Sequence, residues 1–466
     1  MTGDVAQRGR TTGTAPDASS PEGFVTEHPA PGVARSVLPG GLRVVTEHVA
    51  GTRSASVGLW VEVGSRDEPA LGAATHGAAH FLEHLLFKGT GRRSARAIAE
   101  EIDAVGGDLN AFTGKEHTCF YAHVLDRDMP LAVDVLGDVV LDAVMAAPDV
   151  ELERDVVLSE IAGRDEDPED LLADDFDALL FGAHPLGLPV IGTEESVTGM
   201  TRDRLAGFHA RHYGPARSVL AVAGNVAHAD VLAAVARAYG SRLTGDATPW
   251  HRSADGSNGT APELPAQRLA VREEDTEQAH LMLGVPSLRR ADERWPALQV
   301  LSTVLGGGMS SRLFQQVREQ RGLAYSVYSS TAGYADTGTL AVYVGCAPER
   351  LGAAATVVGD ELGDLAAHGI SDAELVRARG QLRGELVLGL EETSARMTRL
   401  GRRELDHGGL DRATDLTGTL ERIDAVTAGD VASLASSLLR GTRAAAVVGP
   451  YRDVDELPAP VREMVR

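Results

Sequence analysis

The sequence predicts an α+β fold of two homologous domains, each an α/β sandwich in which helices pack on an antiparallel sheet. Three observations lead to this prediction. The chain has 466 residues, which exceeds the usual size of one domain. Strand-like alternating segments rich in Val are separated by longer helix-like segments. The order of these segments repeats once along the chain, and a single long repeat indicates a duplicated domain rather than a solenoid.

The first half begins and ends with strands. Val-rich alternation around Gly40 and Gly41 predicts paired strands, and Gly106 and Gly107 close the second of two predicted helices. The predicted strands lie in residues 36–66, 109–125 and 218–226, and the predicted helices lie in residues 76–87 and 94–107, in the stretch beyond residue 125 through Phe181, and in residues 202–213.

Composition sets the expected boundaries of the two domains. Residues 1–35 begin with a segment rich in Thr, Pro, Gly and Ser, which is typical of a flexible tail. Residues 244–265 hold Gly, Ser, Asn and Pro in a pattern typical of a linker. We therefore expect a first domain in residues 36–243, a second in residues 266–455 and a short tail in residues 456–466.

A numbering shift of 223 relates the two halves. The shift pairs Ser56 with Ala279, His123 with Cys346, Glu151 with Glu374, Leu152 with Leu375, and Arg154 with Arg377. Each half places a strand pair first, then a helix pair, a second strand run, long helices and a final Val-rich strand. This common order is what predicts two domains of one design.

Charge and cysteine content exclude several classes of protein. The 44 Lys and Arg against 67 Asp and Glu give a formal net charge of −23, whereas a nucleic-acid-binding protein needs a basic surface. The chain has no apolar run of about 18 residues, the length that predicts a membrane-spanning helix. The N-terminal segment lacks the apolar core of a secretion signal. Cys119 and Cys346 are too few for a disulfide framework. We expect a cytoplasmic protein with neither nucleic-acid nor membrane partners.

His80, Glu83 and His84 form an H-x-x-E-H motif in a helix-like stretch. Residues four apart share one helix face, so both imidazoles can bind one zinc ion at roughly 2.0–2.1 Å. Glu83 lies beside them, where a carboxylate can take a proton from a water whose pKa zinc lowers towards about 7. This order is the inverted form of the zinc-peptidase motif. The alternative is a pair of surface histidines on an amphipathic helix, and a third ligand is needed to distinguish the two.

The segment GAAHFLEHLLFKGT resembles the signature of the pitrilysin family, which includes insulin-degrading enzyme and the mitochondrial processing peptidases. That family takes its third zinc ligand from a glutamate on a second helix downstream, and Glu160 in ERDVVLSEIAGRDEDP matches that position. The resemblance implies one zinc ion (Zn²⁺) per chain, held by His80, His84 and Glu160, with Glu83 as the catalytic base. It also implies that Glu153, two helical turns before Glu160, assists the site.

The second half lacks the candidate metal-binding residues. At the shift of 223, the residues His80, Glu83, His84 and Glu160 meet Thr303, Gly306, Gly307 and Arg383. We therefore expect the first domain to be the catalytic zinc domain and the second to be its homologue without a metal.

Two further segments carry the resemblance. NAFTGKEHTCFY resembles the family's edge strand, which binds extended substrate as an added strand, and this implies substrate contacts by Asn110, Ala111 and Phe112. LGGGMSSRLFQQVREQRGLAYSVYSS resembles a segment of the family's second half. It implies that Arg318 and Tyr325 are catalytic residues that hold the substrate backbone and stabilise the oxyanion. The alternatives are an ordinary buried strand, a surface arginine and a packed tyrosine.

A chain of this length corresponds to one half of the clamshell that the family's long single-chain members form. In those members the zinc domain and the arginine–tyrosine pair belong to different halves of the clamshell. The resemblance therefore implies that Arg318 and Tyr325 complete the site of a partner subunit. We expect a homodimer with two complete sites, and a heterodimer with a related chain is the alternative.

The function predicted from these residues is that of a zinc metalloendopeptidase that hydrolyses peptide bonds in unfolded peptides or extended segments. The alternative is a non-catalytic scaffold subunit of a processing-peptidase-like heterodimer, which the presence of the zinc motif and Glu160 argues against. A purely structural zinc site is a third reading, but three ligands beside a free carboxylate describe an open site. The acidic run in residues 165–177 is interpreted either as a solvated helix face or as an attraction for basic substrates.

Overall fold

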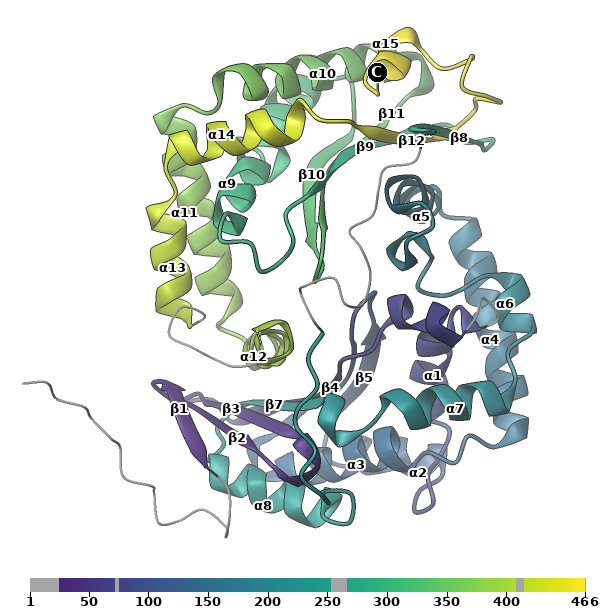
Figure 1. Ribbon diagram of the computed structural model, residues 1–466, viewed down its shortest axis with the longest axis vertical. Coiled ribbons are helices and arrows are strands. Elements are labelled where there is room, and N and C mark those ends of the chain that lie inside the picture. Colours follow the sequence, from purple (N-terminus) through teal and green to yellow (C-terminus); the bar gives the residue numbers. More distant parts are fainter. Residues whose placement is uncertain (1–24, 72–74, 253–265, 408–414, 466) are drawn as a thin grey trace, which may run out of the picture.

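The structure is a computed structural model that describes residues 25–71, 75–252, 266–407 and 415–465. Across these residues the strands form a seven-stranded sheet and a five-stranded sheet, each packed against helices (Figure 1). The two sheets lie in different halves of the molecule, and each half has its own apolar core. The predicted α+β class with two domains is confirmed.

The first sheet has the strand order β1-β2-β3-β7-β4-β6-β5 and the second has the order β10-β11-β9-β12-β8. The strands are β1 (Thr26–Ala30), β2 (Val33–Val37), β3 (Arg43–His48), β4 (Ser54–Val61), β5 (Asp108–Thr113), β6 (Thr118–Leu125), β7 (Ser218–Gly224), β8 (Leu269–Glu273), β9 (Ala279–Ser287), β10 (Ser326–Gly333), β11 (Gly338–Cys346) and β12 (Ala444–Gly449).

The helices connect these strands and cover the faces of the sheets (Figure 1). They are α1 (Ala78–Leu86), α2 (Ala95–Asp103), α3 (Met129–Asp142), α4 (Ala147–Asp165), α5 (Pro168–Phe181), α6 (Glu194–Thr198), α7 (Arg202–His212), α8 (His228–Tyr239), α9 (Trp295–Gly306), α10 (Leu351–His368), α11 (Asp372–Gly389), α12 (Thr393–His407), α13 (Leu416–Ala425), α14 (Ala428–Leu439) and α15 (Ala459–Glu463).

The two sheets share one topology. Read from β8, the second sheet runs β8-β12-β9-β11-β10, which repeats the order β3-β7-β4-β6-β5 of the first. In the first sheet Ser56 pairs with His123, and in the second Ala279 pairs with Cys346, so the strands are related by the shift of 223. Each sheet departs from the predicted antiparallel pattern at one matching position, because β3 runs parallel to β7 and β8 runs parallel to β12.

The shift does not carry through the helices. Moved by 223, α1 would fall on residues 301–309, whereas α9 spans Trp295–Gly306. The residue-by-residue match of His80 with Thr303 is therefore not a structural one. The sequence of α9 contains no His, Asp or Glu, so the second half still lacks the ligands of α1 under any alignment of the two helices.

Each half contributes one helix that packs on the sheet of the other half. α12, from the second half, packs across β3, β4 and β7 of the first sheet (Figure 1). Its residues Met397, Leu400 and Leu405 form one buried cluster with Trp60 and Val219. This face of the first sheet is apolar, and α12 removes it from water.

The reciprocal contact is made by α5. This helix belongs to the first half by sequence, yet it packs on β9 and β12 of the second sheet. Leu172, Phe176 and Leu180 form a buried cluster there with Ala446 and Val448. The two predicted domains are therefore interlocked, and neither has a complete core within its own residues.

Two glycines in the central strands allow the exchanged helices to approach. A Cβ atom at Gly58 of β4 would lie 2.2 Å from Met397 Sδ, and one at Gly284 of β9 would lie 2.7 Å from Phe176 Cζ. Real Cβ atoms do not come this close to other heavy atoms. A larger residue at either position would push the exchanged helix off its sheet.

Buried ion pairs add to the junction between the halves. Arg66 of the first half donates to Glu116 at 2.5 Å and to Asp336 of the second half at 2.7 Å. Arg290 of the second half donates to the other oxygen of Glu116 at 2.6 Å. Removing one member of such a network leaves its partners charged and buried, which is costly.

The acidic run of residues 165–177 includes exposed acids, as expected of a solvated helix face, and it also has a structural role. The run forms the end of α4 and most of α5, whose apolar side lies on the second sheet. Its carboxylates pair within the chain: Asp174 with Arg164, Asp175 with Arg272, and Asp177 with Lys115. Counting Asp165, which also pairs with Arg164, three bases pair with four of the eight acids of the run, and the run stays negative overall.

Two of the predicted boundaries were wrong. β1 and β2 form a hairpin within residues 26–37, so the tail predicted for residues 1–35 is too long. Its first strand is mostly polar and lies at the sheet edge, where alternation of apolar residues is weak. At the other end α15 lies in the predicted tail 456–466, and its Val461 is buried in the second core.

The predicted linker, residues 244–265, is only partly described. Residues 253–265 lie outside the described part of the chain. The preceding residues pack on the first half, where Arg217 stacks 3.6 Å from the Trp250 ring centre and Arg252 pairs with Asp67 at 2.7 Å. Among the described helices, none combines the length and the apolar character needed to cross a bilayer.

The helix exchange leads to a prediction about stability. Phe176→Ala should lower the free energy of unfolding by about 3–5 kcal/mol, because it leaves a cavity between α5 and the second sheet. Phe176 is 2% exposed, whereas Leu152 on α4 is 64% exposed, so Leu152→Ala is a control that should change stability by less than about 0.5 kcal/mol. Urea unfolding followed by circular dichroism measures both. Equal midpoints for the two variants would contradict the interlocked packing.

Candidate zinc site

Helix α1 carries three polar residues on an otherwise apolar helix. Its residues Ala78, Ala79, Phe81, Leu82, Leu85 and Leu86 are buried in the first core. His80, Glu83 and His84 occupy the remaining stripe, because residues three and four apart share one face of a helix. The apolar face thus fixes the orientation of the stripe that bears the motif.

The start of α1 is held by a buried carboxylate that the sequence gave no sign of. Glu68 accepts hydrogen bonds from the backbone N–H groups of Gly77 and Ala79, each at 2.9 Å. These N–H groups have no partner inside the helix, and a carboxylate also interacts favourably with the positive end of the helix dipole. Glu68 therefore fixes the first turn, from which His80 projects.

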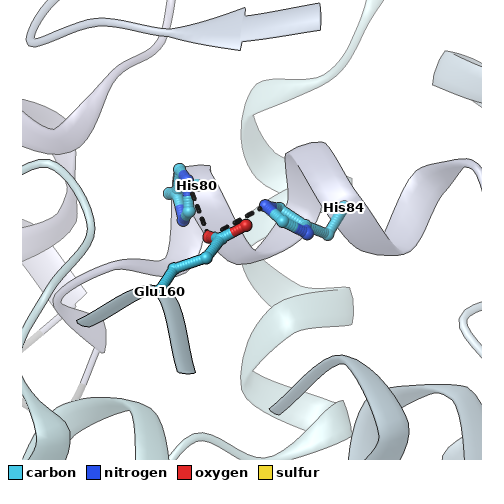
Figure 2. Close-up of side chains that lie close together, drawn as sticks. All are labelled: His80, His84 and Glu160. Carbon is cyan, nitrogen blue, oxygen red and sulfur yellow. Dashed lines mark ion pairs between the residues drawn. The ribbon is translucent and has the colours of Figure 1, made fainter. Parts of the chain in front are cut away.

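Glu160 reaches the two histidines from α4, which packs against α1 (Figure 2). Its Oε2 atom lies 3.7 Å from His80 Nε2 and 3.4 Å from His84 Nε2. Figure 2 shows the two imidazoles, four residues apart on α1, turned toward this carboxylate. The structure thus brings together the three residues that the sequence predicted as zinc ligands.

The spacing of these atoms fits a tetrahedral metal ion. Ligands about 2.0–2.1 Å from a tetrahedral zinc lie about 3.3–3.4 Å from one another. The two separations from Glu160 are close to this value, and all three ligand atoms lie within 4.8 Å of one another. Two nitrogens and one oxygen are also the donor set of many catalytic zinc sites, which leave the fourth position open. Across the described residues, this is the one group of three His, Cys, Asp or Glu side chains whose ligand atoms converge in this way.

His80 is suited to binding a cation as a neutral imidazole. Burial, and then the neighbouring His84, lower the pKa of His80 to about 4. The side chains of His80 and His84 are 17% and 19% exposed, while that of Glu160 is 39% exposed. A metal ion needs unprotonated nitrogens, so an imidazole that is neutral near pH 7 is ready to bind.

Glu153 supports the cluster from behind. One of its carboxylate oxygens lies 3.3 Å from His84 Nδ1, and the other lies 2.5 Å from Lys88 Nζ. A carboxylate in this position fixes the ring of a ligating histidine and leaves Nε2 to face the metal. Lys88, one helical turn after His84, was missed in the sequence, although its spacing of four residues is the signal that could have identified it.

Glu83 lies outside the ligand group and faces the edge strand. The Thr113 hydroxyl donates to Glu83 Oε2 at 2.6 Å. Burial raises the pKa of Glu83 above its ordinary value, while the hydrogen bond from Thr113 opposes that rise. A carboxylate beside the ligands but not among them is placed to accept a proton. Thr113 is a second residue that the sequence did not single out.

The strand that carries Thr113 is the predicted edge strand. β5 ends the first sheet, and along the described chain it pairs with β6 alone. Asn110 and Phe112 are exposed on it, and Ala111 between them is buried. Its free edge can accept an extended peptide as an additional strand. The predicted edge position of these residues is confirmed, and their contact with substrate stays a prediction.

Arg318 and Tyr325 lie together in the second half. Arg318 is in a short π-helical segment, Phe314–Glu319, and its guanidinium carbon lies 5.2 Å from the centre of the Tyr325 ring. π-Helical turns are often found at functional sites. Tyr325 is 79% exposed. Within the described residues, neither side chain has a hydrogen bond or ring contact with the zinc cluster, so the chain does not bring the pair to its own metal site.

A large cleft lies between the first sheet and the helices of the second half. It has a volume of about 1240 Å³ and is lined on one side by Phe112, His117 and Tyr121 of the β5–β6 hairpin. Helices α11, α12 and α13 line the other side. Phe112 is next to Thr113, so the cleft begins one residue from the hydrogen bond that Glu83 accepts.

Comparison with protein families gives two matches that follow one another along the chain. The family model "Insulinase (Peptidase family M16)" matches residues 43–194, and "Peptidase M16 inactive domain" matches residues 199–382. The predicted zinc ligands fall in the first match, and Arg318 and Tyr325 fall in the second.

Several curated relatives are similar over nearly the whole chain. An uncharacterized zinc protease of Mycobacterium leprae is 55% identical over 437 residues, which cover 93% of this chain and 95% of the relative. An uncharacterized zinc protease of Streptomyces coelicolor is 48% identical over 431 residues, covering 92% of each chain. The uncharacterized zinc protease YmxG of Bacillus subtilis is 38% identical over 419 residues, covering 90% of this chain and 98% of the relative.

Solved structures show the same fold. A protease from Helicobacter pylori aligns with a TM-score of 0.81 and 22% identity over 90% of this chain and 99% of the other. The peptidase M16 inactive domain from Pseudomonas fluorescens aligns with a TM-score of 0.79 and 21% identity, again over 90% of this chain. Together with the family matches and the close relatives, this establishes that the chain belongs to peptidase family M16 and confirms the resemblance found in its sequence.

Proposed function

We propose that this chain is a zinc metalloendopeptidase that hydrolyses peptide bonds in unfolded peptides or extended segments. The observation that supports this most is the arrangement around Glu160, whose carboxylate lies 3.4 Å and 3.7 Å from two imidazole nitrogens while Glu83 stands beside them unliganded. Three converging ligands would hold a zinc ion, and the adjacent carboxylate would act on a water molecule. The printed names of the relatives, which are zinc proteases, agree with this proposal.

Each residue has a distinct role in the proposed reaction. A zinc ion held by His80, His84 and Glu160 supplies a lowered water pKa and polarises the scissile carbonyl. Glu83 accepts the proton of the attacking water and passes it to the leaving amine. Thr113 fixes the Glu83 carboxylate through the 2.6 Å hydrogen bond. Since Thr113 ends β5, a peptide added to that strand is positioned relative to the base.

The alternative function is that of a non-catalytic scaffold subunit with the same fold. A non-catalytic subunit has no requirement for a base held outside the ligand group, whereas Glu83 is half-buried and fixed by Thr113. Burying and orienting a carboxylate without a chemical use is unfavourable. This argument favours the enzyme, and the experiments below test both alternatives.

The first experiment compares the wild-type chain with Glu83→Gln on a pool of unfolded peptides. The variant should lose about 10²–10⁴-fold in cleavage rate because it lacks the base, yet it should bind zinc with wild-type stoichiometry because Glu83 is not a ligand. Peptide cleavage is measured by mass spectrometry, and bound zinc by atomic absorption. Glu100→Gln, at an exposed site on α2, is the matched control and should cleave normally.

A chelator should abolish cleavage by the wild-type chain, and zinc should restore it. Cleavage that persists without metal would contradict the proposed chemistry. Zinc binding by both the wild type and Glu83→Gln, with no cleavage by either, would favour a scaffold subunit or a structural zinc site.

A second prediction concerns Thr113. Thr113→Val should lower kcat about 10- to 100-fold, since a hydrogen bond to a charged group contributes about 1.5–3 kcal/mol. Thr113→Ser keeps the hydroxyl and should retain most of kcat, which separates loss of the bond from loss of packing. Steady-state kinetics on one fluorogenic peptide measures both variants. A Val variant with wild-type kcat would show that Glu83 needs no such fixing.

We further propose a homodimer in which Arg318 and Tyr325 complete the zinc site of the partner subunit. Tyr325 is exposed and Arg318 beside it is half-buried, and within the described residues the pair makes no hydrogen bond or ring contact with the chain's own candidate zinc cluster. The role proposed for these side chains is to hold the substrate backbone and to stabilise the oxyanion. A heterodimer with a related chain is the alternative assembly.

Mixed dimers test this assembly. Glu83→Gln and Tyr325→Phe chains should each be nearly inactive alone, but a mixed dimer would hold one intact site. Random mixing of equal amounts should therefore restore roughly a quarter of wild-type activity. Differently tagged chains allow the mixed dimers to be purified before the assay. No recovery in purified mixed dimers would rule out a site shared in this way.

A further inference from the structure

The charges that line the cleft fall into two groups. Beside β5 they are paired: Arg290 contacts Glu116 and Asp406, and Lys115 contacts Asp177. Of the remaining acids of the lining, Asp292 pairs with Arg294, Glu385 accepts a hydrogen bond from Gln381, and Glu293 lies beside Asp292. The second group consists of four arginines on the opposite wall, and three of them have no carboxylate partner among the described residues.

This second group, the arginine cluster, is formed by Arg399, Arg402, Arg403 and Arg422. The first three lie on α12, and Arg422 lies on α13. Thr419 Oγ1 accepts hydrogen bonds from Arg403 at 2.8 Å and from Arg399 at 3.4 Å, which ties the two helices together at the cluster. Within the described residues, Arg402, Arg403 and Arg422 have no carboxylate within ion-pair distance.

Gathering guanidinium groups in a cleft is unfavourable unless an anion joins them. Burial, followed by the charges of Arg399 and Arg422, lowers the pKa of Arg403 to about 9. One guanidinium nitrogen of Arg403 is also buried without a hydrogen-bond partner. Arginine presents a planar fork of N–H donors that matches the two oxygens of a carboxylate.

The position of the cluster indicates where its ligand comes from. Phe112 of β5 lines the same cleft, so a peptide that extends β5 and continues past Phe112 enters the space in front of α12. The protein as a whole has a formal charge of −23, which makes this concentration of positive charge inside the cleft a local exception. Such a group attracts anionic segments of a peptide and disfavours cationic ones.

We propose that Arg399, Arg402, Arg403 and Arg422 form a binding site for the carboxylates of glutamate and aspartate side chains in the peptide substrate. This inference rests on the proposed peptidase function and adds a substrate preference to it. Segments rich in acidic residues bind in front of α12 while the scissile bond lies near α1. The acids of residues 165–177 are not among the residues that line this cleft, so they do not oppose the preference there.

Binding is measured first in the Glu83→Gln chain, so that the peptide stays intact. The probes are a fluorescein-labelled peptide with several glutamates on one side of its centre and its counterpart with glutamines at the same positions. Fluorescence anisotropy should give a Kd roughly fivefold lower for the glutamate peptide at low salt. The difference should shrink in high salt because the charges are partly exposed.

The Arg402→Gln, Arg422→Gln double variant tests the cluster itself. Both side chains are exposed, so the change does not disturb the core. It should remove most of the preference for the glutamate peptide. The matched control is Arg53→Gln with Arg452→Gln, which changes the net charge equally at two exposed sites outside the cleft and should keep the preference.

The outcomes separate this inference from the proposed function. Equal Kd values for the two peptides, or equal loss of preference in the control variant, would overturn the carboxylate site. A preference that depends on Arg402 and Arg422 supports the site even if the wild-type chain fails to cleave peptides. Cleavage by the wild type without any such preference would leave the peptidase proposal standing and remove this one.

Discussion

The exchange of α5 and α12 between the halves is the constraint on which the rest of the structure depends. Both sheets have apolar side chains on both faces, and an uncovered apolar face of this size is unstable in water. Each half supplies enough helices for one face of its own sheet, and the second face is covered by a helix from the other half. The two sheets are therefore held in one fixed relation, reinforced by the buried Arg66–Glu116–Arg290 network.

This relation produces both the cleft and the free edge beside it. α12 lies across β3, β4 and β7, while β5 at the far end of the sheet keeps a free hydrogen-bonding edge. The same helix forms one wall of the cleft that begins at Phe112. The helix that completes the core of the first half thus also carries three of the four arginines proposed to recognise substrate. One face of this amphipathic helix packs on the first sheet, and the other carries the arginines that line the cleft.

The sequence predicted the residues proposed to carry out the chemistry better than it predicted the residues that hold them in place. His80, Glu83 and His84 are adjacent in sequence on one helix, so their spacing alone places them on one face. Glu160 could be predicted only from the family resemblance, because no local spacing in the sequence relates α4 to α1. Glu68 and Thr113 act across the fold, and no local pattern connects either of them to α1. The exchange of α5 and α12 was missed for a similar reason, since helical periodicity shows that a face is apolar but not which sheet it covers.

The corresponding helices α1 and α9 differ in how much of their surface is buried, and this difference explains why only α1 carries candidate metal ligands. α1 has one buried face and one half-buried stripe, and that stripe is available for His80, Glu83 and His84. α9 is buried almost all round, because α11, α13 and α14 pack against it in addition to β10. A helix that is enclosed in this way has no side from which charged ligands could face a substrate, and its sequence contains none. In the second half the charged residues lie instead on α12, on α13 and in the π-helical segment with Arg318. The proposed metal ligands therefore lie on the first half of the duplicated fold, and the arginines proposed for substrate and transition-state binding lie on the second.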